Sequence, residues 1–99
     1  MPLFKVKSTS FPDVGELLIA ADDGFEAMDW FGRIVGITLN ASARAVCPSD
    51  EDDAVRNVER WWGNYCDRAD GNASIDDAEF DAVLDRMECT FHAIYNGGA

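Results

Sequence analysis

The sequence predicts an α+β fold in which a small sheet of about three strands carries helices, in the order β-β-α-β-α-α. Three observations predict this fold. Short segments in the first half alternate apolar and polar residues, a helix-capping pattern lies between them, and two long stretches of the second half have apolar residues every three or four positions. With 99 residues, 47% of them hydrophobic, the chain is expected to form a single domain over residues 1–99.

Two strands are expected near the start of the chain. Residues 3–8 alternate apolar and basic side chains, which is the pattern of a half-buried strand, and residues 16–21 form a short apolar run. The segment between them contains Pro12 and Gly15 and is expected to be a loop. The two strands could therefore pair as a hairpin with a long connection.

A helix and a third strand are expected to follow. Asp23 and Glu26 have the spacing of a capping box, and Gly36 is well placed to end the helix. The expected apolar face of this helix comprises Met28, Phe31, Ile34 and Val35. Residues 37–45 alternate again and predict the third strand.

The last two helices are expected to form an antiparallel hairpin. Ser49 is the expected N-cap of the first, and residues 68–72 are expected to form the turn between the two. The positions of the first helix expected to face the core are Val55, Val58, Trp62 and Tyr65. The second is expected to start at Ser74 or Ile75 and to reach about Tyr95, with an apolar stripe of Phe80, Val83, Leu84, Met87, Phe91 and Ile94.

The charge is strongly acidic and unevenly distributed. The formal net charge is −11, and residues 50–99 hold thirteen of the nineteen acids but only four of the eight bases. Such a field repels nucleic acid and anionic membranes, so neither is an expected partner. It attracts basic surfaces, and proteins that bind nucleic acid carry the most basic ones.

Four acids of the last helix are the main candidate site. Asp77, Asp81, Asp85 and Glu88 fall on one side of this helix, at spacings of four, four and three. Like charges four residues apart destabilise a helix by about 0.2–0.5 kcal/mol per pair. Acids near a helix start are favoured by the macrodipole, but Asp81, Asp85 and Glu88 lie beyond the first turn. The alternatives are a solvated face and a face that binds a partner.

Tryptophans supply a second candidate contact. Trp62 fits the apolar stripe of its helix and is expected in the core, whereas Trp61 lies at the edge of that stripe. Trp61 is therefore the candidate for an exposed partner contact. A face of small residues on the last helix could pack on another element or on a second subunit, so a homodimer stays an alternative; it comprises Ala78, Ala82, Cys89 and Ala93.

Two metal hypotheses are weaker. Residues 67–79 resemble an EF-hand calcium loop, with Glu79 at loop position 12, but Arg68 stands at the anchoring first position and Ala73 where a Gly makes the sharp turn. Cys47, Cys89 and His92 could hold zinc if the helices pair antiparallel, although no close-spaced cysteine pair supports the site. We therefore expect no metal and no cofactor.

The composition favours binding over catalysis. The chain has one His, no nucleophile or phosphate-loop motif, three widely spaced cysteines that are expected to be reduced, and no expected signal peptide, so we expect a cytoplasmic protein that is not an enzyme. In size, charge and lack of catalytic residues it is similar to the DNA-mimic inhibitors that phages encode, including anti-CRISPR proteins, a likeness of class that no motif carries. The expected function is to dock on the basic surface of a nucleic-acid-binding protein, in the host cytoplasm if the protein is phage-encoded. The alternative is a helical-hairpin module with a degenerate EF-hand-like loop, calcium-binding or structural.

Overall fold

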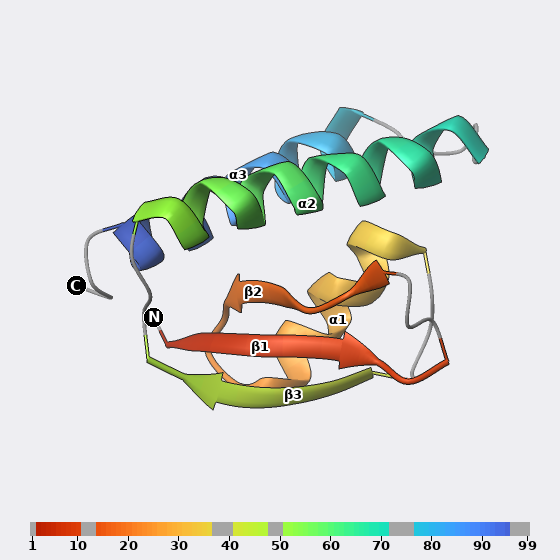
Figure 1. Ribbon diagram of the computed structural model, residues 1–99. Helices are drawn as coiled ribbons and strands as arrows, with labels where there is room; N and C mark the ends of the chain where they lie inside the picture. Colours follow the sequence, from red (N-terminus) through yellow and green to blue (C-terminus); the bar gives the residue numbers. More distant parts are fainter. Residues whose placement is uncertain (1, 11–13, 37–40, 48–50, 72–76, 96–99) are drawn as a thin grey trace.

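The computed structural model describes residues 2–10, 14–36, 41–47, 51–71 and 77–95 (Figure 1). The elements are β1 (Leu3–Ser8), β2 (Leu17–Ala20), α1 (Gly24–Val35), β3 (Ala41–Val46), α2 (Glu51–Gly71) and α3 (Asp77–Tyr95). The predicted class and order, α+β with β-β-α-β-α-α, are confirmed. None of the helices in the described part of the chain is long and apolar enough to cross a membrane.

The three strands form one antiparallel sheet in the order β2-β1-β3. Leu3 on the central strand lies opposite Ala20 of β2 and Val46 of β3, which fixes the register across the sheet. Because side chains alternate along a strand, Phe4 and Val6 lie on the face that α1 covers. The antiparallel pairing of β1 with β2 confirms the expected hairpin of the first two strands.

Helix α1 begins and ends as its sequence predicts. Asp23 has extended backbone angles, and its Oδ1 accepts a hydrogen bond from Glu26 N at 2.8 Å. Gly36 ends the helix in the left-handed conformation, with φ of 76°, and donates its N–H to Gly32 O. The buried residues of α1 are Ala27, Phe31 and Ile34.

The helical hairpin covers the β2 edge of the sheet. Helices α2 and α3 lie side by side and run in opposite directions (Figure 1). Aromatic residues near the end of α2, Trp62 and Tyr65, pack on Phe80 at the start of α3, whereas Ala54 and Ile94 share a cluster at the opposite end. The antiparallel pairing of the last two helices is thus confirmed.

Several predicted boundaries need correction or cannot be compared. Helix α2 continues to Gly71, so the helix occupies most of the segment 68–72 that was expected to form a turn. The predicted N-cap Ser49, the predicted start of the last helix at 74–75 and residues 37–40 of the predicted third strand lie outside the described residues.

The inward face of α2 differs from the predicted one. Val55 and Trp62 are exposed, and the buried residues of α2 are Ala54, Asn57, Trp61 and Tyr65. The inward face of α2 is rotated because the hairpin packs on the edge of β2. There Asn57 bonds to the backbone N–H and C=O of Leu18, and a pattern of apolar residues cannot predict an inward polar residue. The prediction that Trp62 faces the core, with Trp61 at its edge, was wrong.

Candidate functional site

The four candidate acids form the solvent face of α3. The opposite side of the helix buries Val83, Thr90, Ala93 and Ile94 against the rest of the molecule. At about 100° per residue, this packing turns the carboxylates outward. All four are exposed; we call Asp77, Asp81, Asp85 and Glu88 the acidic ladder.

The acidic ladder is extended and poorly compensated by bases. With a rise of about 1.5 Å per residue, its first and last members lie about 16 Å apart along the helix axis. Glu88 Oε1 lies 3.7 Å from His92 Nε2. Among the described residues, no Lys, Arg or His comes within ion-pair distance of Asp77, Asp81 or Asp85. Three of the four carboxylates therefore face solvent with no base of the described residues beside them.

Three of the four arginines in the second half of the chain bind groups of other elements or of the segments between them. Arg86 Nη1 donates to Ala20 O at 2.9 Å and lies 3.3 Å from Glu26 Oε1. Arg60 donates to the carbonyl of Glu16, and Arg68 lies near Glu79. Because these guanidinium groups bind backbone and carboxylate groups away from the ladder, they do not neutralise it.

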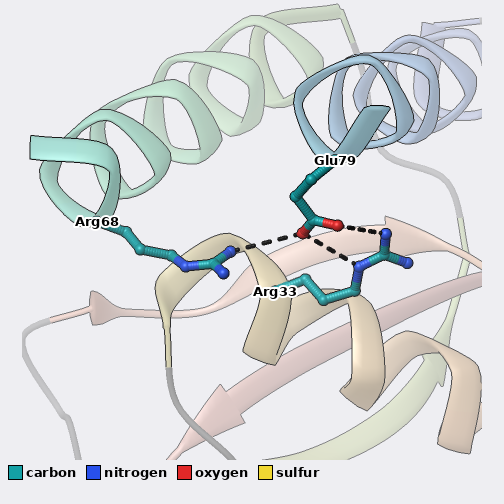
Figure 2. A network of polar contacts seen from close by, with 3 residues as sticks. All are labelled: Arg33, Arg68 and Glu79. Carbon is teal, nitrogen blue, oxygen red and sulfur yellow. Dashed lines mark hydrogen bonds and ion pairs between the residues drawn. The ribbon is translucent and has the colours of Figure 1, made fainter. Parts of the chain in front are cut away.

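A cluster of two arginines and one glutamate ties α3 to the other helices (Figure 2). Arg33 from α1 donates through Nη2 to Glu79 Oε2 at 2.7 Å and through Nε to Oε1 at 3.3 Å. Arg68 Nη1 from α2 approaches Glu79 Oε1 at 3.7 Å. We call Arg33, Arg68 and Glu79 the arginine clamp. It joins α1 and α2 to the first turn of α3, where the acidic ladder begins.

The environment of Arg33 stabilises its charge. The hydrogen bond to Glu79 raises the pKa of Arg33, while partial burial acts in the opposite direction. The guanidinium also stacks over the ring of Trp30, at 4.0 Å from the ring centroid, and Arg86 lies over the same ring at 5.0 Å. The clamp is thus part of a wider polar seam between α1 and the hairpin.

The clamp uses two residues of the EF-hand-like segment. Glu79, at the position of the bidentate calcium ligand, has both carboxylate oxygens engaged by Arg33. Arg68, at the first ligand position, approaches the same carboxylate. Loop residues 72–76 lie outside the described residues. The contacts around Glu79 favour a structural role for this segment over the calcium alternative.

The residues of the zinc hypothesis do not come together. No three His, Cys, Asp or Glu residues of the described part of the chain are placed to hold a metal ion. Cys47 is exposed after β3, and His92 on α3 pairs with Glu88. None of the three cysteines forms a disulfide bond.

The two tryptophans exchange their predicted roles. Trp61 is only 1% exposed, and its Nε1 donates to Leu18 O at 3.0 Å, so it cannot reach a partner without unfolding and leaves the candidate site. Trp62 is 42% exposed and packs edge-on against Phe80, with ring centroids 6.0 Å apart.

Sequence reasoning therefore missed an aromatic pair beside the ladder. Phe80 lies between Asp77 and Asp81 in the sequence and is itself partly exposed. At about 100° per residue Phe80 lies within the predicted apolar stripe, so the periodicity gave no signal of its exposure. Exposed aromatic side chains are common energetic centres of protein interfaces.

Helix α2 carries exposed acids as well. Asp52 and Glu59 of α2 are exposed, and Arg56 lies 4.0 Å from Asp53 Oδ1.

Comparison with protein-family models, curated proteins and solved structures finds no match for this chain.

Proposed function

We propose that the chain is a non-enzymatic binding protein whose acidic ladder docks on the basic, nucleic-acid-binding surface of a partner protein and blocks that surface. The observation that supports this proposal is the exposure of the ladder, three of whose four carboxylates have no described base within ion-pair distance. Lys and Arg side chains that otherwise neutralise phosphates can bind carboxylates instead, through charge-assisted hydrogen bonds. A phage-encoded inhibitor of the DNA-mimic type, such as an anti-CRISPR protein, would have this function and would act in the host cytoplasm.

Two features of the ladder fit this role. Its members are carried on one rigid helix, which the arginine clamp and the buried face of α3 hold in place, so the carboxylates are positioned before binding. The exposed Trp62–Phe80 pair, whose Phe80 lies between Asp77 and Asp81 in the sequence, offers an apolar contact near the start of the ladder, and interfaces commonly combine apolar and polar contacts. The contact would thus combine charge with a small apolar anchor.

The test removes the ladder's charge without changing its shape. The variant Asp81→Asn, Asp85→Asn, Glu88→Gln should keep or slightly raise the melting temperature, because repulsion along the helix is relieved. A matched control, Asp22→Asn, Asp29→Asn, Glu59→Gln, removes the same charge from exposed positions on other elements. Both variants and the native chain are used to capture proteins from a nuclease-treated candidate host lysate.

We expect the native chain and the control variant to capture the same nucleic-acid-binding protein, and the ladder variant to lose it. An added DNA or RNA duplex should displace that protein from the native chain, because both compete for one basic surface. Affinity should also fall steeply with salt, since the contact is screened over a Debye length of about 8–10 Å at 0.1–0.15 M. Equal capture by the ladder variant, or capture that a duplex does not displace, would contradict the proposal.

A further inference from the structure

A basic surface lies on the sheet of this acidic protein, on the face away from α1. Phe4 and Val6 pack toward α1, so the alternate residues of β1, Lys5 and Lys7, lie on the opposite face. The register places Arg44 of β3 directly opposite Lys5 and Ser42 opposite Lys7. We call Lys5, Lys7 and Arg44 the basic face; it holds three of the eight bases of the chain.

The basic face keeps its charge largely uncompensated. Lys5 Nζ lies 3.6 Å from Glu16 Oε2, but no described carboxylate comes within ion-pair distance of Lys7 or Arg44, which are both exposed. Lys5 and Arg44 are like charges at directly opposite positions of two strands, an arrangement that destabilises a sheet. A ligand that carries negative charge would relieve this repulsion.

The strand beside the basic face has an open edge. β3 is the last strand of the sheet, and no other strand of the described chain pairs with it on the side away from β1 (Figure 1). Most of its side chains are small: Ala41, Ser42, Ala43 and Ala45. Among the described residues, none bonds to its outward backbone groups, so a further strand could pair with them.

We propose that the β3 edge and the basic face together bind an extended acidic segment of a partner protein, which adds to the sheet as a fourth strand. Main-chain hydrogen bonds to β3 would hold the segment, as in other cases of strand addition. Acidic residues at every second position of the segment would lie about 7 Å apart on one face, near Arg44 and the two lysines. This site uses none of the residues of the acidic ladder, and it stands independently of the proposed function.

Charge favours an acidic segment over two other possible occupants of this site, a second copy of the chain and a nucleic acid. A second copy of the chain would pair β3 with β3, which brings a second Arg44 toward the first in a complex of two molecules that each carry −11. Nucleic acid is repelled by the same net charge, and the basic face carries no aromatic side chain on which bases could stack. A short acidic segment meets mainly the local positive charge, because the more distant acids are screened at physiological salt.

The probe is a fluorescent heptapeptide of alternating Glu and Val, titrated at low salt against the full chain. We expect saturable binding, and NMR shifts of the β3 amides at Ala41–Val46 but not of the acidic ladder. The double variant Lys7→Glu, Arg44→Glu should weaken binding at least tenfold. Arg56→Glu on α2, an equally exposed base outside the site, should change it less than twofold. Two further heptapeptides carry N-methyl groups on alternate amides, one on the odd and one on the even positions. Only one of the two should lose binding, because only alternate N–H groups of an added strand point toward β3.

The remaining outcomes overturn the proposal. They are no saturable binding of the heptapeptide at millimolar concentration, equal affinity of the double variant, or equal affinity of both methylated peptides. A chain that sediments as a dimer, and as a monomer after Arg44→Glu, would show that a second copy occupies the edge. Binding of an oligonucleotide that the double variant abolishes would assign the face to nucleic acid. Thermal melts of the variants confirm that each is folded before it is titrated.

Discussion

At the β2 edge of the sheet, side chains from two helices bind the outward backbone groups, whereas at the β3 edge no described residue takes up these groups. Asn57 of α2 donates to Leu18 O at 2.8 Å and accepts from Leu18 N at 2.9 Å. Thr90 Oγ1 of α3 accepts from Ala20 N at 2.9 Å. Together with the bonds from Trp61 and Arg86, these contacts form what we call the β2 seal: Asn57, Trp61, Arg86 and Thr90.

The difference between the edges shows how the fold positions its surfaces. A buried backbone N–H or C=O must find a partner, so covering β2 with helices requires polar side chains on their inward faces. Those bonds fix the rotation of α3 and so turn the acidic ladder outward. No described residue covers the β3 edge in this way, and the strand keeps a charged residue, Arg44; charged side chains are also a common protection of edge strands against aggregation. The β2 edge thus orients the acidic ladder, and the β3 edge is itself a candidate binding site.

The largest expected effect breaks the β2 seal at its tryptophan. Trp61→Ala should lower the free energy of unfolding by about 3–5 kcal/mol, because it leaves a cavity in the core and removes the bond to Leu18 O. Trp62→Ala is the matched control on the next residue, and should cost about 1 kcal/mol or less, since that ring is half in solvent. Urea denaturation measures both. Equal losses would contradict the assigned orientation of α2.

The misassigned face of α2 shows where sequence reasoning stopped. The spacing of Val55, Val58, Trp62 and Tyr65 gives a regular apolar stripe, but the true inward row contains Asn57. An inward Asn is recognisable only when a strand edge is known to lie beneath it. Similarly, Arg86 and Thr90 are polar residues of α3 whose partners lie about seventy residues away in β2. No local pattern contains that information.

Other features followed from local rules and were predictable. The N-cap Asp23 and the C-cap Gly36 act on their own helix within a few residues, so the sequence around them contains the whole interaction. The alternation of residues 3–8 and the outward direction of the acidic ladder depend on one periodicity each. The arginine clamp was not predictable, because Arg33, Arg68 and Glu79 come from three helices.

A second prediction tests the seal through hydrogen bonding alone. Asn57→Ala should lower the free energy of unfolding by about 1–3 kcal/mol, because Leu18 N loses its partner in a partly buried place and Leu18 O keeps only the bond from Trp61. Ser42→Ala at the open edge is the control and should lie within about 0.5 kcal/mol of the native chain. The comparison fails if the two substitutions cost the same in urea titrations.

A third prediction concerns the clamp that holds the hairpin over the β2 edge. Glu79→Gln should cost about 1–2 kcal/mol, less than a fully buried ion pair, because Arg33 is about a third exposed and solvent screens part of the interaction. Glu88→Gln, next to an exposed His92, is the control and should be within about 0.5 kcal/mol. Because the pKa of Arg33 is raised, its contribution is fully present at neutral pH and is lost only as pH rises through the strongly basic range in which a guanidinium deprotonates.

Thermal melting with calcium and with a chelator separates the arginine clamp from a metal site. Calcium should leave the melting temperature of the native chain unchanged, and so should a chelator, because the carboxylate of Glu79 is engaged by arginine. If calcium raised the melting temperature by several degrees, and Glu79→Gln abolished that rise, the EF-hand-like alternative would replace the structural reading of this segment.

The smallest expected effect is a gain in stability at the open edge. Arg44→Glu converts a like-charge pair with Lys5 into an opposite-charge pair at directly facing positions, which should raise the free energy of unfolding by about 0.2–1 kcal/mol. The side chain is exposed, so no core contact is lost. Arg56→Glu, which brings a third acid beside Asp52 and Asp53, should instead be neutral or slightly destabilising. Urea denaturation of both variants at low salt resolves the difference, and added salt should reduce it. A loss of stability in Arg44→Glu would mean that the arginine supports the strand itself. A gain in stability, combined with the expected loss of binding to the acidic heptapeptide, would show that Arg44 is retained at the open edge at the expense of the fold.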